Sequence, residues 1–115
     1  MKLAQIVRQL HLNVLTAQDK LDAEVGFGYT SDLLSDVMAN SKEGYVWITL
    51  QVHQNIIAVA KLKELAGIIM VNNRQPQEET KKKAEEEGVP ILMTADSAFE
   101  ISGKLYRLLK EEQRN

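Results

Sequence analysis

Four short polar segments carry most of the side chains in this sequence that could bind or transform a ligand. Each segment follows an apolar run typical of a strand and precedes a pattern typical of a helix. Hydroxyl, amide, carboxylate, imidazole and guanidinium groups gather in them, at Tyr29, Thr30, Ser31, Asp32, Thr49, Gln51, His53, Asn55, Asn72, Asn73, Arg74, Thr94, Asp96 and Ser97. Such groups suit a small polar or anionic ligand if the fold brings them together. Many of these residue types are also ordinary helix caps, so a purely structural role stays open for each one.

His53 and Arg74 are the members of this set that favour a reaction. Imidazole titrates near neutral pH, and a guanidinium binds carboxylates and phosphates through paired N–H donors. One hypothesis is therefore a small enzyme that acts on a phosphorylated or carboxylated metabolite, with His53 as acid or base and Arg74 on the anion. It requires both side chains in one open pocket. No metal site and no cofactor are predicted, because the chain has no cysteine and His53 has no second histidine at ligand spacing.

Composition excludes several classes of partner. The chain has 14 Lys and Arg against 16 Asp and Glu, so its net charge of -2 gives no basic surface for nucleic acid or anionic lipid. No stretch approaches the ~20 apolar residues of a membrane span, and the first residues lack the apolar core of a signal peptide. We therefore predict a cytoplasmic protein that binds neither nucleic acid nor a membrane.

Strand-like and helix-like segments alternate along the chain, with one domain over residues 1–115 by length. The later strands are continuously apolar, as in parallel sheets covered on both faces. This predicts an α/β domain with a small, largely parallel or mixed sheet flanked by helices. The expected strands are 12–16, 23–32, 45–50, 66–71 and 89–94, and the expected helices are 2–10, 33–40, 55–65, 78–88 and 98–112.

Three further features refine this picture. Trp47 lies in an apolar strand and is expected in the core or an interface, and Ser97 with Glu100 predicts a capping box at the start of the last helix. Gly26 and Gly28 predict a bulge or a close backbone approach in the second strand.

The apolar strands and the long amphipathic last helix offer more apolar surface than a small sheet covers, which predicts a homodimer.

The order of these segments resembles the DRTGG domain over nearly the whole chain. The resemblance is carried by GYTSDLLSDVMAN, GYVWITLQVHQNIIAVAKL, LAGIIMVNN and EEEGVPILMTADSAFEISGKL, and most specifically by AGIIMVNN and GVPILMTADSAFE. The fold it implies is similar to that of the N-terminal domain of HPr kinase/phosphatase. The chain contains no Asp-Arg-Thr-Gly-Gly, and Val52 and His53 stand where the family usually has Asp-Arg.

The resemblance implies a function of the regulatory kind. Members of this family are typically accessory modules that often self-associate, and free-standing copies occur beside iron hydrogenase genes in anaerobes. The leading interpretation is thus a non-catalytic ligand-sensing or protein-interaction module, associated with iron hydrogenase metabolism. A third hypothesis, a structural partner of a redox complex, predicts that the polar strand ends are filled and that an apolar patch lies exposed elsewhere.

Overall fold

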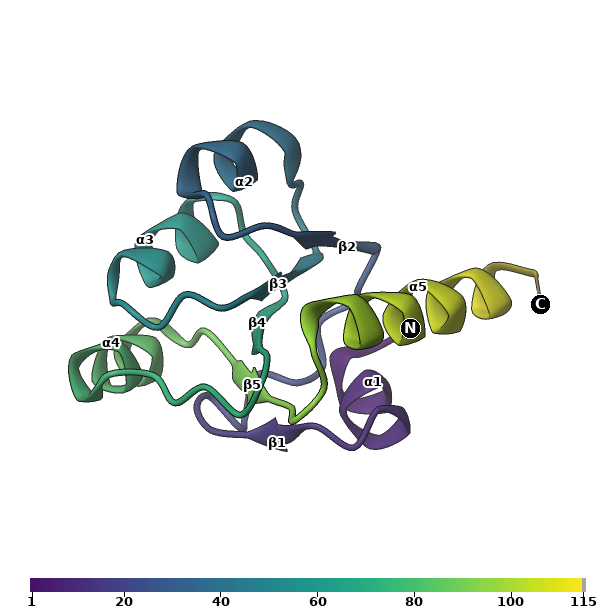
Figure 1. The fold of residues 1–115 in the computed structure, drawn as a ribbon, viewed down its shortest axis with the longest axis horizontal. Helices are drawn as coiled ribbons and strands as arrows, with labels where there is room; N and C mark the ends of the chain where they lie inside the picture. The colour runs from purple at the N-terminus through teal and green to yellow at the C-terminus, as the bar shows by residue number, and fades with distance from the viewer. Residues whose placement is uncertain (115) are drawn as a thin grey trace.

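A five-stranded mixed sheet with helices on both faces forms the molecule (Figure 1). The computed structural model describes residues 1–114. Strands lie in the order β1-β5-β4-β3-β2; β1 is antiparallel to β5, and all other neighbours are parallel. The strands are β1 (Asn13–Val14), β2 (Phe27–Thr30), β3 (Tyr45–Thr49), β4 (Gly67–Met70) and β5 (Ile91–Met93). The helices are α1 (Leu3–Gln9), α2 (Leu34–Asn40), α3 (Asn55–Leu62), α4 (Glu78–Glu87) and α5 (Ala98–Arg114). The predicted α/β class and flanked mixed sheet are confirmed.

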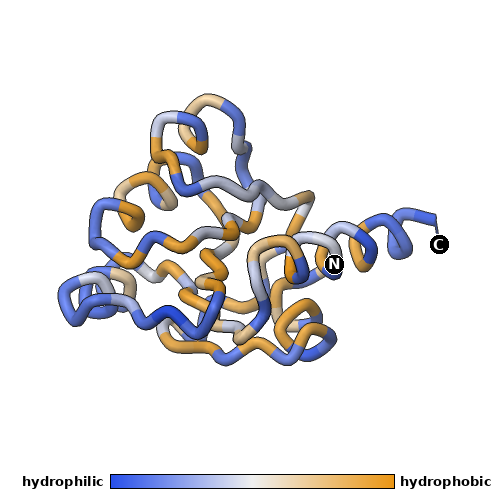
Figure 2. The backbone as a smooth tube through the Cα atoms, in the orientation of Figure 1, coloured by the Kyte–Doolittle hydropathy of each residue, from blue (hydrophilic) through white to orange (hydrophobic). Residues whose placement is uncertain are grey.

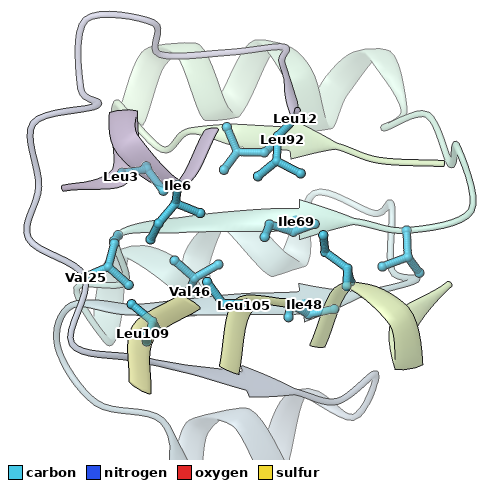
Figure 3. Packing of buried hydrophobic residues seen from close by; sticks show 13 residues of the cluster. Leu3, Ile6, Leu12, Val25, Val46, Ile48, Ile69, Leu92, Leu105 and Leu109 are labelled. Carbon is cyan, nitrogen blue, oxygen red and sulfur yellow. The ribbon is translucent and has the colours of Figure 1, made fainter. Parts of the chain in front are cut away.

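Each face of the sheet has its own apolar core. On one face α1 and α5 pack against side chains such as Val46, Ile48 and Leu92 (Figure 3). On the other face α2, α3 and α4 pack around Trp47 and Ile68. The two sets alternate along β3, β4 and β5, as the pleat requires. Both faces are covered, so the central strands β4 and β5 consist of apolar residues and glycine, and Figure 2 shows mostly hydrophobic residues at the centre of the molecule.

Trp47 is fully buried in this second core, as expected of an apolar strand. Its indole N–H donates a 2.8 Å hydrogen bond to the carbonyl oxygen of Ser31, just after β2. Trp47 therefore fixes the end of the neighbouring strand as well as filling volume.

The first two strands are shorter than the sequence pattern predicts. The segment 12–16 forms a strand only at β1, because the buried Thr16 uses its hydroxyl to donate to the carbonyl of Val89 and to accept from the N–H of Ile91. The segment 23–32 forms a strand only at β2. The close approach expected at Gly28 is present, since a Cβ there would lie 2.9 Å from Cδ2 of Leu105.

Helix boundaries agree better with the pattern. The N–H of Glu100 donates to Oγ of Ser97, and the N–H of Ser97 donates to the Glu100 carboxylate, both at 3.2 Å, so the predicted capping box is present. Gly88 ends α4 in the left-handed region, with φ of 68°. Within residues 1–114 no helix is both long and apolar enough to cross a bilayer.

Candidate functional site

The four polar segments lie along one edge of the sheet, because β2, β3, β4 and β5 are parallel and each is followed by a loop that leads into a helix. We call this edge the strand-end edge; it comprises residues 31–33, 50–54, 71–77 and 94–97. Several of its polar side chains bond to backbone groups of the edge or to side chains next to it. They form two groups rather than one open cleft.

The first group joins the ends of β2 and β3 through Asp32. Oδ1 of Asp32 accepts hydrogen bonds from Oγ1 of Thr49 at 2.8 Å and from the N–H of Leu50 at 2.7 Å. Gln51 closes the group: its side-chain amide donates to the carbonyl of Asp32, and its N–H donates to Oγ1 of Thr49. Since Thr49 is buried, the carboxylate of Asp32 satisfies a hydroxyl that would otherwise lack an acceptor.

The second group joins the ends of β4 and β5. Asn72 and Asn73 both have φ of 56°, a left-handed conformation that asparagine tolerates. Their N–H groups donate to the carbonyls of Asp96 at 2.9 Å and Thr94 at 2.8 Å, and Oγ1 of Thr94 accepts from the N–H of Asp96. Lys104 of α5 completes the group with a 2.8 Å ion pair to Asp96, which raises the pKa of Lys104 above its ordinary value.

Val52 links the loop after β3 to the loop after β4. Its carbonyl oxygen accepts from the N–H of Gln77 at 3.2 Å and from Oγ1 of the buried Thr80 at 2.7 Å. The start of α4 is thereby held against the approach to α3. Arg74 lies in the connecting loop, exposed, and belongs to no ion pair within the described chain.

His53 is exposed and acts as a cap. Its Nδ1 accepts a 3.2 Å hydrogen bond from the N–H of Asn55 at the start of α3. A partly enclosed hollow of about 180 Å³ lies elsewhere, between β2 and α5, and its lining includes neither His53 nor Arg74. The geometry of an acid or base in an open pocket is therefore not present at His53, and the enzyme hypothesis gains no support.

Three predicted site residues at β2 serve other parts of the structure. The hydroxyl of Tyr29 donates to both carboxylate oxygens of Asp36 on α2 at 2.9 Å. Hydrogen bonds from the hydroxyls of Ser31 and then Tyr29 lower the pKa of Asp36. Thr30 points to the opposite face, where its Oγ1 shares a 2.7 Å hydrogen bond with Oγ of Ser102 on α5. These side chains do not join the groups around Asp32 and Asp96.

Sequence reasoning missed two partners at the strand ends, Lys104 and Asp36. Lys104 lies in α5 and Asp96 lies before that helix begins, and nothing in the local pattern pairs them. Asp36 lies on a helix that only the fold places beside Tyr29. Among residues 1–114, no three His, Asp or Glu side chains come together in a way that could hold a metal ion.

Comparison with known proteins identifies a family and structural relatives, of which one is described below. A family model described as the DRTGG domain matches residues 5–108. The fold is similar to a solved structure of the CBS and DRTGG domains of the regulatory region of a Clostridium perfringens pyrophosphatase, complexed with its activator diadenosine tetraphosphate. The TM-score is 0.69 at 14% sequence identity, over 90% of this chain and 45% of that one, so this chain spans less than half of that structure. No curated protein matches the sequence.

Proposed function

Because the chain belongs to the DRTGG domain family, we propose that it is a non-catalytic regulatory module that binds a small polar or anionic ligand at the strand-end edge and acts as a homodimer. The pyrophosphatase relative supports a regulatory role, since its DRTGG domain is part of a regulatory region solved with a nucleotide activator. The edge supplies amide, carboxylate, imidazole and guanidinium groups that can bind such a ligand.

The observation that carries the ligand proposal is the position of Arg74. Arg74 is exposed in the loop that follows β4, and within residues 1–114 it forms no ion pair with a carboxylate. A free guanidinium binds a phosphate or carboxylate through two parallel N–H donors. His53, Asn72 and Asn73 of the strand-end edge, and Asn55 directly after it in the sequence, are exposed as well.

Thermal unfolding with added ligands tests this proposal. The probes are diadenosine tetraphosphate, mononucleotides and acetyl phosphate, each titrated to saturation. A ligand present at 100 times its dissociation constant should stabilise the protein by about 2.7 kcal/mol. Arg74→Gln should weaken binding about tenfold, the equivalent of one charge-assisted hydrogen bond. Arg8→Gln, on the exposed side of α1, is the matched control and should bind as the unmodified chain does.

A second candidate, a structural partner of a redox complex, is favoured by one observation. The carboxylates of Asp32 and Asp96 are already bonded within the chain, while Phe99 and Tyr106 of α5 remain 90% and 55% exposed. This function predicts no thermal shift with any of the small probes and a stable complex with a purified iron hydrogenase. A shift that is lost in Arg74→Gln would decide for ligand sensing. The association with iron hydrogenase metabolism is a prediction that the same binding measurement tests.

A further inference from the structure

Strand β2 is one of the two edge strands of the sheet and lies next to α5. Tyr29 and Ser31 direct their backbone N–H and C=O toward β3, as shown by the 3.2 Å bond from the N–H of Ser31 to the carbonyl of Ile48. Neighbouring residues of a strand direct these groups to opposite sides, so those of Gly28 and Thr30 point outward. Within the described chain, the outward N–H and C=O groups of Gly28 and Thr30 form no backbone hydrogen bond with a turn, loop or helix. Residues 27–30 contain no charge and no proline, the usual means of blocking an exposed edge.

Beside this edge, α5 carries a largely exposed stripe with two aromatic rings, of which Tyr106 also meets Phe27 of β2 edge-to-face at 5.8 Å between ring centroids. Phe99 and Tyr106 are two turns apart on one side of the helix and are 90% and 55% exposed. Between them lie the small residues Ser102 and Gly103, and a Cβ added to Gly103 would meet nothing within 4 Å. Next to the stripe is the hollow of about 180 Å³, lined by Phe27, Gly28, Thr30, Ser102, Leu105 and Tyr106 together with Ile48 and Leu109.

From these features we propose that two copies of the chain associate through antiparallel pairing of their β2 strands, with the α5 helices side by side. The proposal rests on the homodimer proposed above and assigns its surface. A twofold axis at Tyr29 lets Gly28 and Thr30 exchange both backbone hydrogen bonds with Thr30 and Gly28 of the second copy. Four backbone hydrogen bonds result, and the two sheets become one.

The same axis suits α5. Thr30 touches Ser102, and Gly28 lies against Leu105, so α5 runs antiparallel to β2 and Tyr29 is level with Gly103 and Lys104. The midpoint between Phe99 and Tyr106 falls between Ser102 and Gly103, at almost the same level. Rotation about one axis therefore places Phe99 of each copy beside Tyr106 of the other, at the mouth of its hollow.

Spacing and charge are both compatible with this arrangement. Helix α5 packs over β2 and β3, so the two α5 helices would lie about two strand spacings apart, ~9.6 Å. Packed helices prefer an interaxial distance of about 8–10 Å. Nζ of Lys110 lies 5.5 Å from the ring centroids of Phe27 and Tyr106. Because Phe27 would face Ser31 of the second copy, Lys110 approaches the exposed Asp32 there.

Sedimentation velocity over a dilution series tests the surface with paired variants. Thr30→Pro removes the outward N–H and should weaken association at least about tenfold, whereas Thr30→Val loses only the hydroxyl and should stay dimeric. Phe99→Lys should dissociate the dimer. Leu62→Lys, at an exposed leucine on α3, is the control and should not. Circular dichroism of each variant verifies that it remains folded.

The outcomes separate this inference from the proposed function. If the dimer survives both Thr30→Pro and Phe99→Lys, the proposed interface is refuted, and the proposal that the chain forms a homodimer is kept. An unmodified chain that stays monomeric at millimolar concentration overturns both. A third outcome is a monomeric chain in which a small aromatic compound shifts the NMR signals of Phe99 and Tyr106. The hollow then binds a ligand instead, and the inference is refuted. Loss of dimer in the two variants, with both controls dimeric, supports it.

Discussion

The strand-end edge and the flank formed by β2 and α5 differ in how their exposed groups are satisfied. At the strand-end edge, the carboxylates of Asp32 and Asp96 accept hydrogen bonds from neighbouring residues, so both already have partners. At the flank, Gly28 and Thr30 present backbone groups outward, and Phe99 and Tyr106 present rings to solvent. Polar residues that suggest a binding site in the sequence therefore form a rigid framework around Asp32 and Asp96. The flank has few polar side chains, but it has more backbone groups and rings without a partner.

The largest expected effect contrasts one large aromatic residue from each region. Trp47→Ala removes a fully buried side chain and its hydrogen bond to the end of β2, and should lower the free energy of unfolding by about 3–5 kcal/mol. Phe99→Ala, at a 90% exposed position, should change it by less than about 0.5 kcal/mol. Urea denaturation of dilute samples measures both. A destabilisation by Phe99→Ala as large as that by Trp47→Ala would mean that the flank is part of the monomer core.

The framework role of Asp32 gives the next effect. Asp32→Ala leaves the buried hydroxyl of Thr49 and the N–H of Leu50 without their acceptor, at a cost of about 1.5–3 kcal/mol in unfolding free energy. Asp22→Ala, at an exposed loop position, is the matched control and should stay within about 0.5 kcal/mol. Equal stability of the two variants would show that Asp32 is not structural and would return it to the list of residues free to bind a ligand.

The smallest effect concerns the Tyr29–Asp36 pair and depends on pH. The pKa of Asp36 is lowered from its ordinary value of 3.8, so the pair stabilises the fold above that pH and loses this contribution as pH falls through the lowered pKa. The pKa of Tyr29 is raised from 10.0, first by the hydrogen bond to Asp36, so the contribution is also lost at strongly alkaline pH. Tyr29→Phe should therefore be less stable than the unmodified chain at pH 7 and indistinguishable from it in strong acid.

Thermal unfolding across pH measures this difference, with Tyr45→Phe as the control that keeps its edge-to-face contact with Phe27. A Tyr29→Phe deficit that persists unchanged in strong acid would mean that packing, and not the carboxylate, is responsible.

Much of the fold was predictable because element type follows from the spacing of apolar residues. Runs such as 66–71 gave β4, and the capping residues Ser97 and Glu100 gave the start of α5. Strand length was harder to predict. Thr16 has the residue type of a strand, but its hydroxyl replaces the ladder bonds that would have extended β1.

The site was predictable only as an edge. Parallel strands bring their ends together whatever the side chains do, so the location follows from the alternation of strands and helices. The partners of each side chain depend on long-range packing: Asp96 pairs with Lys104, and Tyr29 with Asp36. The flank was not predicted because α5 has apolar residues on two sides. Leu105 and Leu109 lie on the side that packs in the core, and Phe99 and Tyr106 lie on a second, exposed side. The spacing of apolar residues in the sequence does not separate these two sides.

Amide hydrogen exchange at two protein concentrations tests the contrast between the regions most directly. The N–H of Leu50, bonded to Asp32, should be protected equally in dilute and concentrated samples. The N–H groups of Gly28 and Thr30 should exchange rapidly when the chain is dilute and become protected when it is concentrated. Rapid exchange of Leu50 at both concentrations, or unchanged exchange of Gly28 and Thr30 on concentration, would contradict the account of a satisfied strand-end edge and an associating flank.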